Sequence, residues 1–419
     1  MAGGVPVLSP GQLLEDRELR RYADAVVHGC LRLAEGDVLF IQAHVEHREL
    51  VVALADSGYG AGARLVDVQY LEPLAQAARI RHAAEEYLGP APPWRATALR
   101  AHLAADAAVV TIIADADEGA FDGLAHERVA RDFLGPAQKF GWYVRAIEAG
   151  RRRWVGVSWP TAYWAGKVYP DADVQTARRL LADDLLAFAR LGPDDPPGIA
   201  GWTAHTERIA ARSRTLTELG LARLELRAPG TELDVRLPPG TSWLGGQDRD
   251  AHDRLIATNL PTEENYTSPD ARSASGVFRC TRPLVYQNRV IDGITGEFRG
   301  GRLARLGAAA DDDRDFLAAF IHGDRNADRL GEVALVDRES RIGRARRTYF
   351  HTLLDENAVA HIAFGSGFGQ ARLPDAPRGD VNKANVHIDV MIGSDDFEAT
   401  GIGPGTRRVP LIREGEWQI

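Results

Sequence analysis

The chain has 419 residues, of which 45% are apolar and 26% charged, with a formal net charge of −9 and a pI near 5.8. This composition is typical of a soluble globular protein with two domains or one large α/β unit. The excess of acidic residues argues against a nucleic-acid partner, because phosphate binding depends on concentrated Lys and Arg.

The small number of cysteines and the lack of a visible targeting or membrane-spanning segment argue against further classes of protein. The two cysteines, Cys30 and Cys280, provide neither a disulfide framework nor a cysteine-based zinc site. No secretory signal is visible, and no apolar run approaches the roughly 18–20 residues that span a bilayer. We therefore expect a soluble cytoplasmic protein. The short basic clusters 151–153 and 344–347 are expected to be solvated surface.

The first half alternates helices and strands. Apolar residues recur at helical spacing over 12–33, and this predicted helix ends before Gly36. Alternation of this kind predicts a mostly parallel sheet with helices on its faces. The other expected elements are strands at 38–43, 63–70, 107–115 and 154–160 and a helix at about 47–61. The motif GYGAGA at 58–63 follows a helix instead of a strand, so it does not predict a nucleotide site.

The pattern changes in the second half. The cluster GPDDPPG at 192–198 predicts a linker, and a helix at about 202–219 follows it. Two strands then flank the turn at 229–230, and further strand-like runs have Gly-rich connections. We predict an α/β fold that divides near residue 205. Residues 1–205 would form an N-terminal α/β domain with a mostly parallel sheet, and 206–419 a mixed α+β catalytic domain.

Four segments of the second half carry polar side chains in apolar or tightly turned surroundings. They are NLPTEENYTSPD (259–270) with Glu263 and Glu264, GEVALV (331–336) with Glu332, DENAVAHIAFG (355–365) with Asp355, Glu356 and His361, and HIDVMIGS (387–394) with His387 and Asp389, preceded by Asn382 and Asn385. Each segment alone has an ordinary explanation, such as an exposed strand end, a hydrogen-bonded core histidine or a helix start.

Together these segments predict a metal centre. His387 and Asp389 lie two apart in an expected strand, so they share a face about 6.6 Å apart. Carboxylates and imidazoles without thiolates are the ligands expected for Zn²⁺, Mn²⁺, Co²⁺ or Fe²⁺ in catalytic sites. Five such groups can hold two ions with a shared carboxylate and leave positions for water and substrate.

At these residues the sequence resembles the metal-dependent aminopeptidases of the aminopeptidase T and aminopeptidase S type. The likeness spans nearly the whole chain, from RYADAVVHGCLRLAEGDVLFIQAHVE (21–46) onward, and is strongest in the four polar segments. It implies a homodimer that uses two divalent ions (zinc, cobalt or manganese) to remove single N-terminal residues from short peptides. The implied metal ligands are Glu332, His361, His387, Asp389 and one of Glu263 and Glu264, the other glutamate being the general base.

One position departs from the pattern. Many relatives carry a tyrosine seven residues after the first histidine, where this chain has Phe368, which cannot donate a hydrogen bond. Loss of one such donor typically costs about 10²–10³ in turnover. The metals could act alone, Tyr349 or a backbone N–H could replace the donor, or the substrate could differ from an ordinary peptide. A local shift of the alignment is the structural alternative. Asp355 and Asn382 are further candidates for contact with the ligands or the substrate.

Two other functions remain open at this point. A related branch with this scaffold uses one Fe²⁺, held by a Glu, two His and an Asp, to open dihydroxypyridine rings with O₂. The tandem Glu263-Glu264 and the full-length likeness favour the peptidase. A catalytically impaired homologue that keeps its metals for stability is the second alternative.

Overall fold

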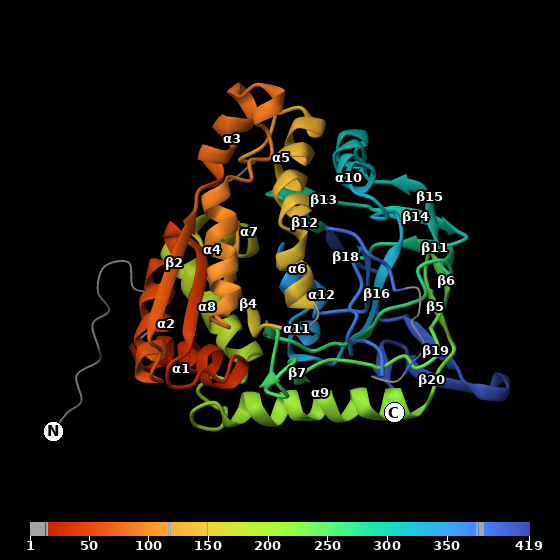
Figure 1. Cartoon of the computed structure of the whole chain (residues 1–419). Coiled ribbons are helices and arrows are strands. Elements are labelled where there is room, and N and C mark those ends of the chain that lie inside the picture. The colour runs from red at the N-terminus through yellow and green to blue at the C-terminus, as the bar shows by residue number, and fades with distance from the viewer. Residues whose placement is uncertain are drawn as a thin grey trace.

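The computed structural model describes residues 13, 16–115, 117, 119–148, 150–373, 376 and 381–419. Within them the chain forms a five-stranded, a four-stranded and an eight-stranded sheet, together with two short two-stranded ribbons. The five-stranded sheet lies on one side of the molecule, the eight-stranded sheet on the other, and the four-stranded sheet between them (Figure 1). The predicted α/β class, with a parallel sheet in the first half, is confirmed.

The five-stranded sheet is parallel throughout, in the order β2-β1-β3-β4-β9. Helices connect its strands, which is the arrangement that a parallel sheet requires. Its strands are β1 (Val38–His44), β2 (Leu65–Leu71), β3 (Ala108–Ile113), β4 (Trp154–Ser158) and β9 (Asn259–Leu260). The helices of this half are α1 (Asp16–Asp24), η1 (Ala25–Cys30), η2 (Val45–His47), α2 (Arg48–Gly60), α3 (Pro73–His82), η3 (Glu85–Tyr87), α4 (Pro93–Ala104), α5 (His126–Lys139), α6 (Gly141–Glu148), α7 (Ala162–Val168) and α8 (Val174–Phe188). The predicted helix at 12–33 is thus an α-helix followed by a π-helical turn.

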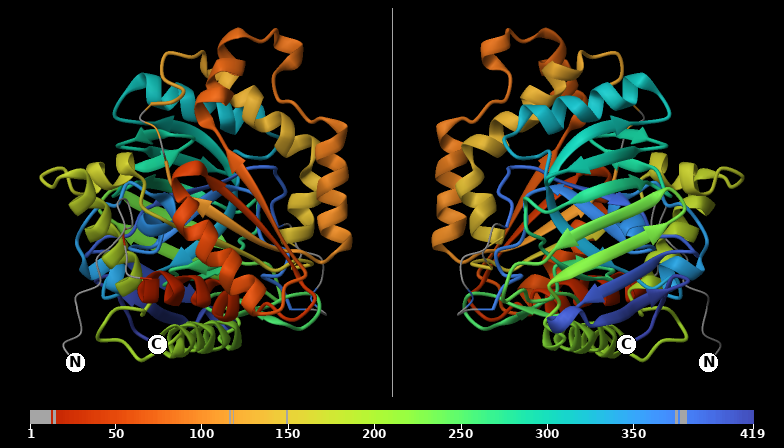
Figure 2. Two further views of the ribbon diagram at one scale, coloured as in Figure 1. Left: turned by 90° about the vertical axis from the view of Figure 1, so that its left-hand side faces the viewer. Right: turned by 90° about the vertical axis from the view of Figure 1, so that its right-hand side faces the viewer.

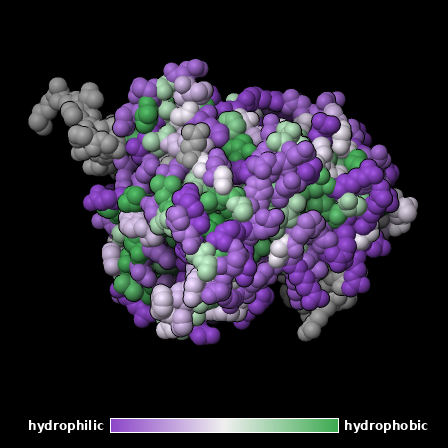
Figure 3. All heavy atoms as spheres, turned by 90° about the horizontal axis from the view of Figure 1, so that it is seen from above, coloured by the Kyte–Doolittle hydropathy of each residue, from purple (hydrophilic) through white to green (hydrophobic). Residues whose placement is uncertain are grey.

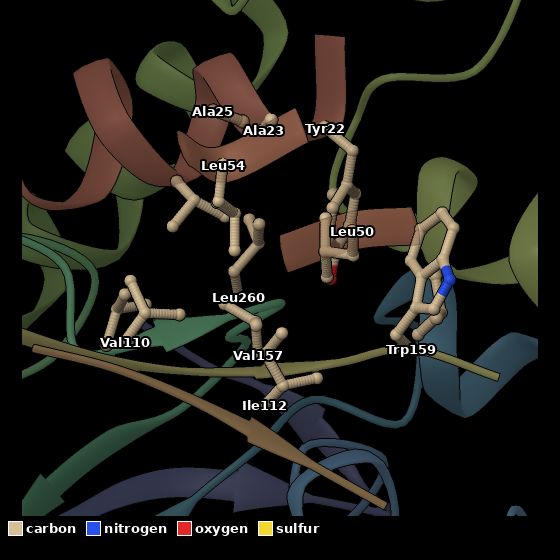
Figure 4. Packing of buried hydrophobic residues seen from close by; sticks show 14 of the residues in the cluster. Tyr22, Ala23, Ala25, Leu50, Leu54, Val110, Ile112, Val157, Trp159 and Leu260 are labelled. Atoms are coloured by element: carbon tan, nitrogen blue, oxygen red, sulfur yellow. The ribbon is translucent and has the colours of Figure 1, made fainter. Parts of the chain in front are cut away.

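One face of this sheet packs against α1, α2 and α8 to form the first hydrophobic core. Figure 4 shows Ile112 of β3 and Val157 of β4 beneath Leu54 of α2. Leu260 lies among them, although it comes from the second half of the chain. Strand β9 therefore fastens the segment 259–270 to the edge of the first sheet, next to β4.

The first basic cluster is not solvated surface, and that expectation is wrong for two of its residues. Arg152 and Arg153 are 0% and 1% exposed. Arg152 Nε donates to the carbonyl of Ala107 at 3.1 Å, and Arg153 pairs with Asp37 Oδ2 at 2.8 Å. A guanidinium can be buried where carbonyls and carboxylates accept hydrogen bonds from it, as they do at the start of β4.

Helix α9 (Ala200–Glu218) runs beneath both halves (Figure 1) and leads into the eight-stranded antiparallel sheet, seen broadside in the right panel of Figure 2. The predicted hairpin is present, with its turn at Pro229 and Gly230, where Gly230 has a φ of 83°. The sheet has the order β15-β14-β11-β6-β5-β19-β20-β21. Its strands are β5 (Arg223–Ala228), β6 (Thr231–Arg236), β11 (Ser275–Arg279), β14 (Thr295–Arg299), β15 (Arg302–Gly307), β19 (Glu398–Ile402), β20 (Arg408–Arg413) and β21 (Glu416–Trp417). The remaining elements outside the central sheet are β7 (Asp248–Arg249), β8 (Leu255–Ile256), β12 (Leu284–Tyr286), β13 (Arg289–Ile291), α10 (Asp311–Gly323), α11 (Arg341–Arg344), α12 (Thr352–Glu356) and η4 (Pro404–Thr406).

The central four-stranded sheet is antiparallel and has two different faces. Its strands are β10 (Asn265–Thr267), β16 (Leu330–Leu335), β17 (His361–Gly365) and β18 (His387–Met391). On one face Val333, Ile362 and Val390 are paired neighbours and belong to the second hydrophobic core. Because side chains alternate along a strand, the opposite face carries the polar residues of the same three strands.

The two halves interlock. Ile342, Tyr349 and Leu354 of the second half belong to the first core, and Ile80 and Leu134 of the first half belong to the second core. Each hydrophobic core thus contains residues from both sides of residue 205. The domain boundary near this residue stays a prediction. Seen from above, hydrophilic residues cover most of the surface, with hydrophobic ones in small groups (Figure 3). None of the helices in the described part of the chain combines the length and the apolar character that a membrane span requires.

Candidate metal centre between two sheets

Two groups of three potential ligands meet on the polar face of the central sheet. In the first, Glu264, Glu332 and His361 each offer one ligand atom, and these atoms lie within 4.8 Å of one another. In the second, Glu332, His387 and Asp389 do the same. Glu332 belongs to both groups, so the residues are arranged as two adjacent sites that share one carboxylate.

The strand register creates this arrangement. Glu332 of β16 lies near Ala363 of β17, which is paired with Asp389 of β18. In the next row Ala334 is paired with His361. Long ligand side chains thus alternate with methyl groups across neighbouring strands, which leaves a hollow above the sheet. Local sequence explains each strand, but only the register between strands brings the ligands together.

Backbone carbonyls orient both histidines. His361 Nδ1 lies 2.9 Å from the carbonyl oxygen of Glu356, and His387 Nδ1 lies 2.8 Å from that of Ser366. A carbonyl only accepts, so Nδ1 carries the proton and donates it, as is usual for a histidine whose other nitrogen binds a metal. Each Nε2 then faces the carboxylates, at 3.2 Å from Glu264 Oε2 for His361 and 3.0 Å from Glu332 Oε2 for His387.

The centre has an excess of negative charge. Burial alone would lower the pKa of His361, but the carboxylates of Glu264, Asp389 and Glu332 outweigh it and raise the pKa to about 10. Burial likewise opposes the charged form of His387, yet Asp389 and Glu332 raise its pKa well above the usual value. The tightly held protons of His361 and His387 balance negative charge that bound metal cations would otherwise balance. Oxygen and imidazole donors in a negatively charged, buried hollow fit divalent metal ions.

The tandem glutamates point in opposite directions, because adjacent side chains of an extended segment diverge. Glu264 reaches the centre, where its Oε1 also accepts a hydrogen bond from Asn259 Nδ2 at 3.3 Å. Glu263 faces away and pairs with Arg190 at 2.6 Å. Its carboxylate lines a separate cavity of about 400 Å³. The structure therefore does not bring Glu263, expected as a possible general base, to the metal centre.

Three other predicted residues lie outside the centre. Asp355 pairs with Arg282 at 2.9 Å and accepts the backbone N–H groups of Tyr349 and His351. The hydroxyl of Tyr349 donates to Asp184 at 2.9 Å, so this tyrosine does not supply the donor that Phe368 lacks. Asn382 donates to the carbonyl of Gly365 at 2.6 Å. Asp355 and Asn382 thus bind backbone groups, while the hydroxyl of Tyr349 binds a side chain of helix α8.

Phe368 does lie at the centre, and its neighbour is a tyrosine. Its ring centroid is 5.3 Å from that of His387 and 5.1 Å from that of Tyr266. The hydroxyl of Tyr266 contacts Asp248 Oδ2 at 3.4 Å. Tyr266 was not predicted as a site residue, although its spacing of two from Glu264 places both on one face of the strand.

Glu356 belongs to the third polar segment of the sequence, where no role was predicted for it. It is 7% exposed and lines the same hollow as the ligands. Burial, reinforced by the carboxylates of Asp389 and Glu264, raises its pKa well above the usual value. Its side chain has a weak contact of 3.4 Å with Asn357 Nδ2. Its position five residues before His361 was the signal that could have given it a role at the centre.

The hollow is a cavity of about 220 Å³ between two sheets. One wall is the polar face of the central sheet, and the opposite wall is the face of the five-stranded sheet that α1, α2 and α8 leave free. Helix α12 and the loop with Phe368 close the sides. The lining residues are Ile113, Trp154, Thr258, Asn259, Glu264, Tyr266, Glu332, Thr352, Leu353, Glu356, His361, Phe368, His387 and Asp389.

Known proteins match this chain over nearly its whole length. The family model of the thermophilic metalloproteases (M29) matches residues 15–417. The chain is 32% identical over 407 residues to an aminopeptidase T of Thermus aquaticus, covering 96% of this chain and 98% of the relative.

Solved structures extend the likeness. The wild-type AmpT structure from Thermus thermophilus superposes with a TM-score of 0.84 at 31% identity, covering 96% of this chain and 99% of that one. A 2,5-dihydroxypyridine dioxygenase from Pseudomonas putida KT2440 superposes with a TM-score of 0.51 at 13% identity over 98% of both chains. The second likeness shows a shared fold alone.

Proposed function

The chain belongs to the thermophilic metalloprotease family M29 and is a metallo-aminopeptidase, and we propose that it uses two divalent ions to remove the N-terminal residue of short peptides. The observation that supports this most directly is the double use of Glu332, whose carboxylate is common to both ligand groups. Glu264 and His361 would hold one ion, and His387 and Asp389 the other. Zinc, cobalt and manganese all suit these donors.

Such ions would supply two effects, a lowered pKa for an attacking water and polarisation of the peptide carbonyl. The chain itself must accept the proton of that water and return it to the leaving amine. Glu356 suits this role better than Glu263, because Glu356 lines the cavity while Glu263 is paired with Arg190. Nearby cations would favour the ionised form of Glu356 and so prepare it to accept a proton.

The small volume of the cavity supports a preference for short peptides. A space of about 220 Å³ between two sheets can receive the end of a chain but not a loop of a folded protein. A homodimer in the cytoplasm stays a prediction from the family likeness.

The ring-cleaving dioxygenase is the less favoured alternative. One iron held by a Glu, two His and an Asp would leave one of Glu264 and Glu332 without a role, and both lie within the ligand groups. The likeness to the dioxygenase structure, at 13% identity, concerns the fold. A non-catalytic homologue is distinguished from the peptidase by activity alone.

The test combines metal content with peptide cleavage. Protein loaded with Zn²⁺, Co²⁺ or Mn²⁺ should bind about two ions per chain and cleave aminoacyl chromogenic substrates. Glu356→Gln should keep both ions and lose about 10²–10⁴-fold in turnover, since general acid–base catalysis contributes this much. The matched control is Glu232→Gln, whose side chain is 75% exposed, and it should behave as the unmodified protein. A single oxygen-sensitive iron, or full activity in Glu356→Gln, would contradict the proposal.

A further inference from the structure

A second cavity lies on the side of the tandem glutamates that Glu263 faces, away from the metal centre. It has a volume of about 400 Å³ and is lined by helix α9, the loop before this helix, the segment 337–344 and Glu263. We call it the arginine cavity, because five arginines line it together with four carboxylates. These residues are Arg190, Arg208, Arg212, Arg341, Arg344, Asp195, Glu263, Asp337 and Glu339. The lining is therefore positive on balance, in a chain whose net charge is −9.

Two of the carboxylates are already paired. Arg341 donates two hydrogen bonds to Asp195, at 2.8 Å and 2.6 Å. Arg190 pairs with Glu263 at 2.6 Å. These two arginines are thus neutralised by partners that belong to the lining itself.

Three guanidiniums of the arginine cavity have no such partner. Over the described ranges of the chain, no carboxylate forms an ion pair with Arg208, Arg212 or Arg344. The two remaining carboxylates, Asp337 and Glu339, do not balance three cations. Charges of one sign gathered in a concave space attract ions of the opposite sign.

Several of these side chains are held in place by the protein. The guanidinium of Arg212 lies over the ring of Trp417, 4.6 Å from its centre, and Arg208 donates to His205 Nδ1 at 3.2 Å. Arg190 is 7% exposed and has a φ of 58°, in the left-handed region that residues other than glycine rarely adopt. Backbone strain of this kind is concentrated at ligand sites. Donors that are fixed in advance lose little conformational entropy when they bind a ligand.

The floor of the arginine cavity is connected to the metal centre. His205 Nε2 donates to the carbonyl of Thr262 at 2.8 Å, and Arg190 holds the next residue, Glu263. Glu264 follows and belongs to a candidate ligand group. An anion in the cavity would compete with Glu263 for Arg190, and a shift of this segment would move Glu264.

The geometry points to the arginine cavity as a regulatory site for a small organic anion that carries several negative charges on phosphate-ester or carboxylate groups. Guanidiniums bind both kinds of group through parallel N–H donors. The cavity volume of about 400 Å³ leaves space for an organic molecule around the charged groups. The effect on catalysis rests on the proposed function, whereas the binding itself does not.

The test measures binding by isothermal titration calorimetry. Glycerol 3-phosphate and succinate are the probes, one for each kind of charged group. At least one of them should bind to a single site on the metal-loaded chain and should still bind after treatment with a chelator. Arg212→Gln and Arg344→Gln should each weaken this binding by about tenfold or more, the scale of one lost charge-assisted hydrogen bond.

The control is Arg325→Gln, because Arg325 is exposed and lines neither this cavity nor that of the metal centre. It should leave the affinity unchanged. Arg212 is half-buried, so Arg212→Gln is checked for folding by circular dichroism. If it does not fold, Arg344→Gln still tests the site, since Arg344 is exposed.

The second readout is catalysis. The probe that binds should change kcat on an aminoacyl chromogenic substrate by about fivefold, the lower end of ordinary allosteric coupling. Arg344→Gln should need about tenfold more probe for the same change, in line with its weaker binding.

The possible failures are distinguishable. No binding of either probe, or equal affinity in both variants and the unmodified protein, would overturn the site. Binding that leaves kcat unchanged would overturn its regulatory role. If no substrate is cleaved at any metal loading, the proposed function fails, and calorimetry still decides whether the arginine cavity binds anions.

Discussion

At the scale of single residues, Phe368 and Tyr266 form an aromatic pair beside the candidate metal centre. Phe368 occupies a place beside His387 where it can pack but cannot donate a hydrogen bond. Tyr266 stands against it, and its hydroxyl contact of 3.4 Å with Asp248 is longer than an ordinary O–H···O bond. A shorter hydrogen bond to an oxygen of the substrate would replace this long one to Asp248.

We expect Tyr266→Phe to lower kcat by about 10–10³-fold with little change in KM or metal content, since loss of one oxyanion donor costs up to this much. Phe368→Tyr added to this variant should restore part of the activity, because the two rings are neighbours. Steady-state kinetics with metal analysis on both variants checks the expectation. Equal kcat for Tyr266→Phe and the unmodified protein would assign stabilisation of the oxyanion to other groups.

At the scale of elements, the alternation of side chains in the central sheet places core residues on one face and candidate metal ligands on the other. Ile362 and Val390 fill the second core, and the residues that precede them in the chain, His361 and Asp389, face the cavity. Ala334 and Ala363 keep the space above the sheet open, since both are paired directly with ligand residues. Residue size at these two positions thus determines whether ions can fit.

Ala363→Leu should therefore abolish binding of at least one ion. The added carbons project into the hollow between Glu332 and Asp389, and overpacking of this kind typically costs about 1–3 kcal/mol. Metal analysis after dialysis against Zn²⁺, with circular dichroism as a check of folding, measures the effect. Ala271→Leu, at a buried alanine that does not line the cavity, is the control for overpacking elsewhere, and it should retain the metals. A folded Ala363→Leu protein with two ions would show that the hollow is wider than the register implies.

At the scale of the whole molecule, the metal centre lies where segments from both halves meet, so its charge affects the stability of the entire chain. The ligands come from three strands of the central sheet and from Glu264 in the segment that β9 fastens to the first sheet. Ions bound there should hold the halves together, because a ligand that binds only the native state stabilises it by about 2.7 kcal/mol at a hundredfold excess over Kd.

Removal of metals should lower Tm and make stability fall as pH rises. In metal-free protein the pKa of His361 is about 10, against an ordinary value of 6.5. Between these values the native state binds more protons than the unfolded state, so the free energy of unfolding decreases with increasing pH. Thermal unfolding of chelator-treated protein from pH 6.5 to 8.5 should show this decline. Metal-saturated protein should not, because the ions replace the protons. A metal-free Tm that rises over this range would contradict the charge excess described for the centre.

Sequence patterns by themselves determined much of this protein. Helical and strand periodicity predicted the parallel sheet of the first half, and the donor chemistry of four segments predicted a metal centre. The family likeness then implied Glu332, His361, His387 and Asp389 as its ligands. The prediction of the parallel sheet is confirmed, because alternation is a local property of the chain. The metal centre stays a prediction, although the structure brings these four side chains together. The same reasoning wrongly predicted that Arg152 and Arg153 are solvated. A local pattern does not show which distant carbonyls and carboxylates accept hydrogen bonds from them.

Only the tertiary structure decided the rest. It directed Glu264 to the centre and Glu263 to Arg190, because the orientation of an extended segment depends on what it packs against. It added Glu356 and Tyr266 to the cavity and left Asp355, Tyr349 and Asn382 outside it. Register between strands and the pairing of β9 with β4 are contacts between residues far apart in sequence, and they determine which of the available side chains share one hollow.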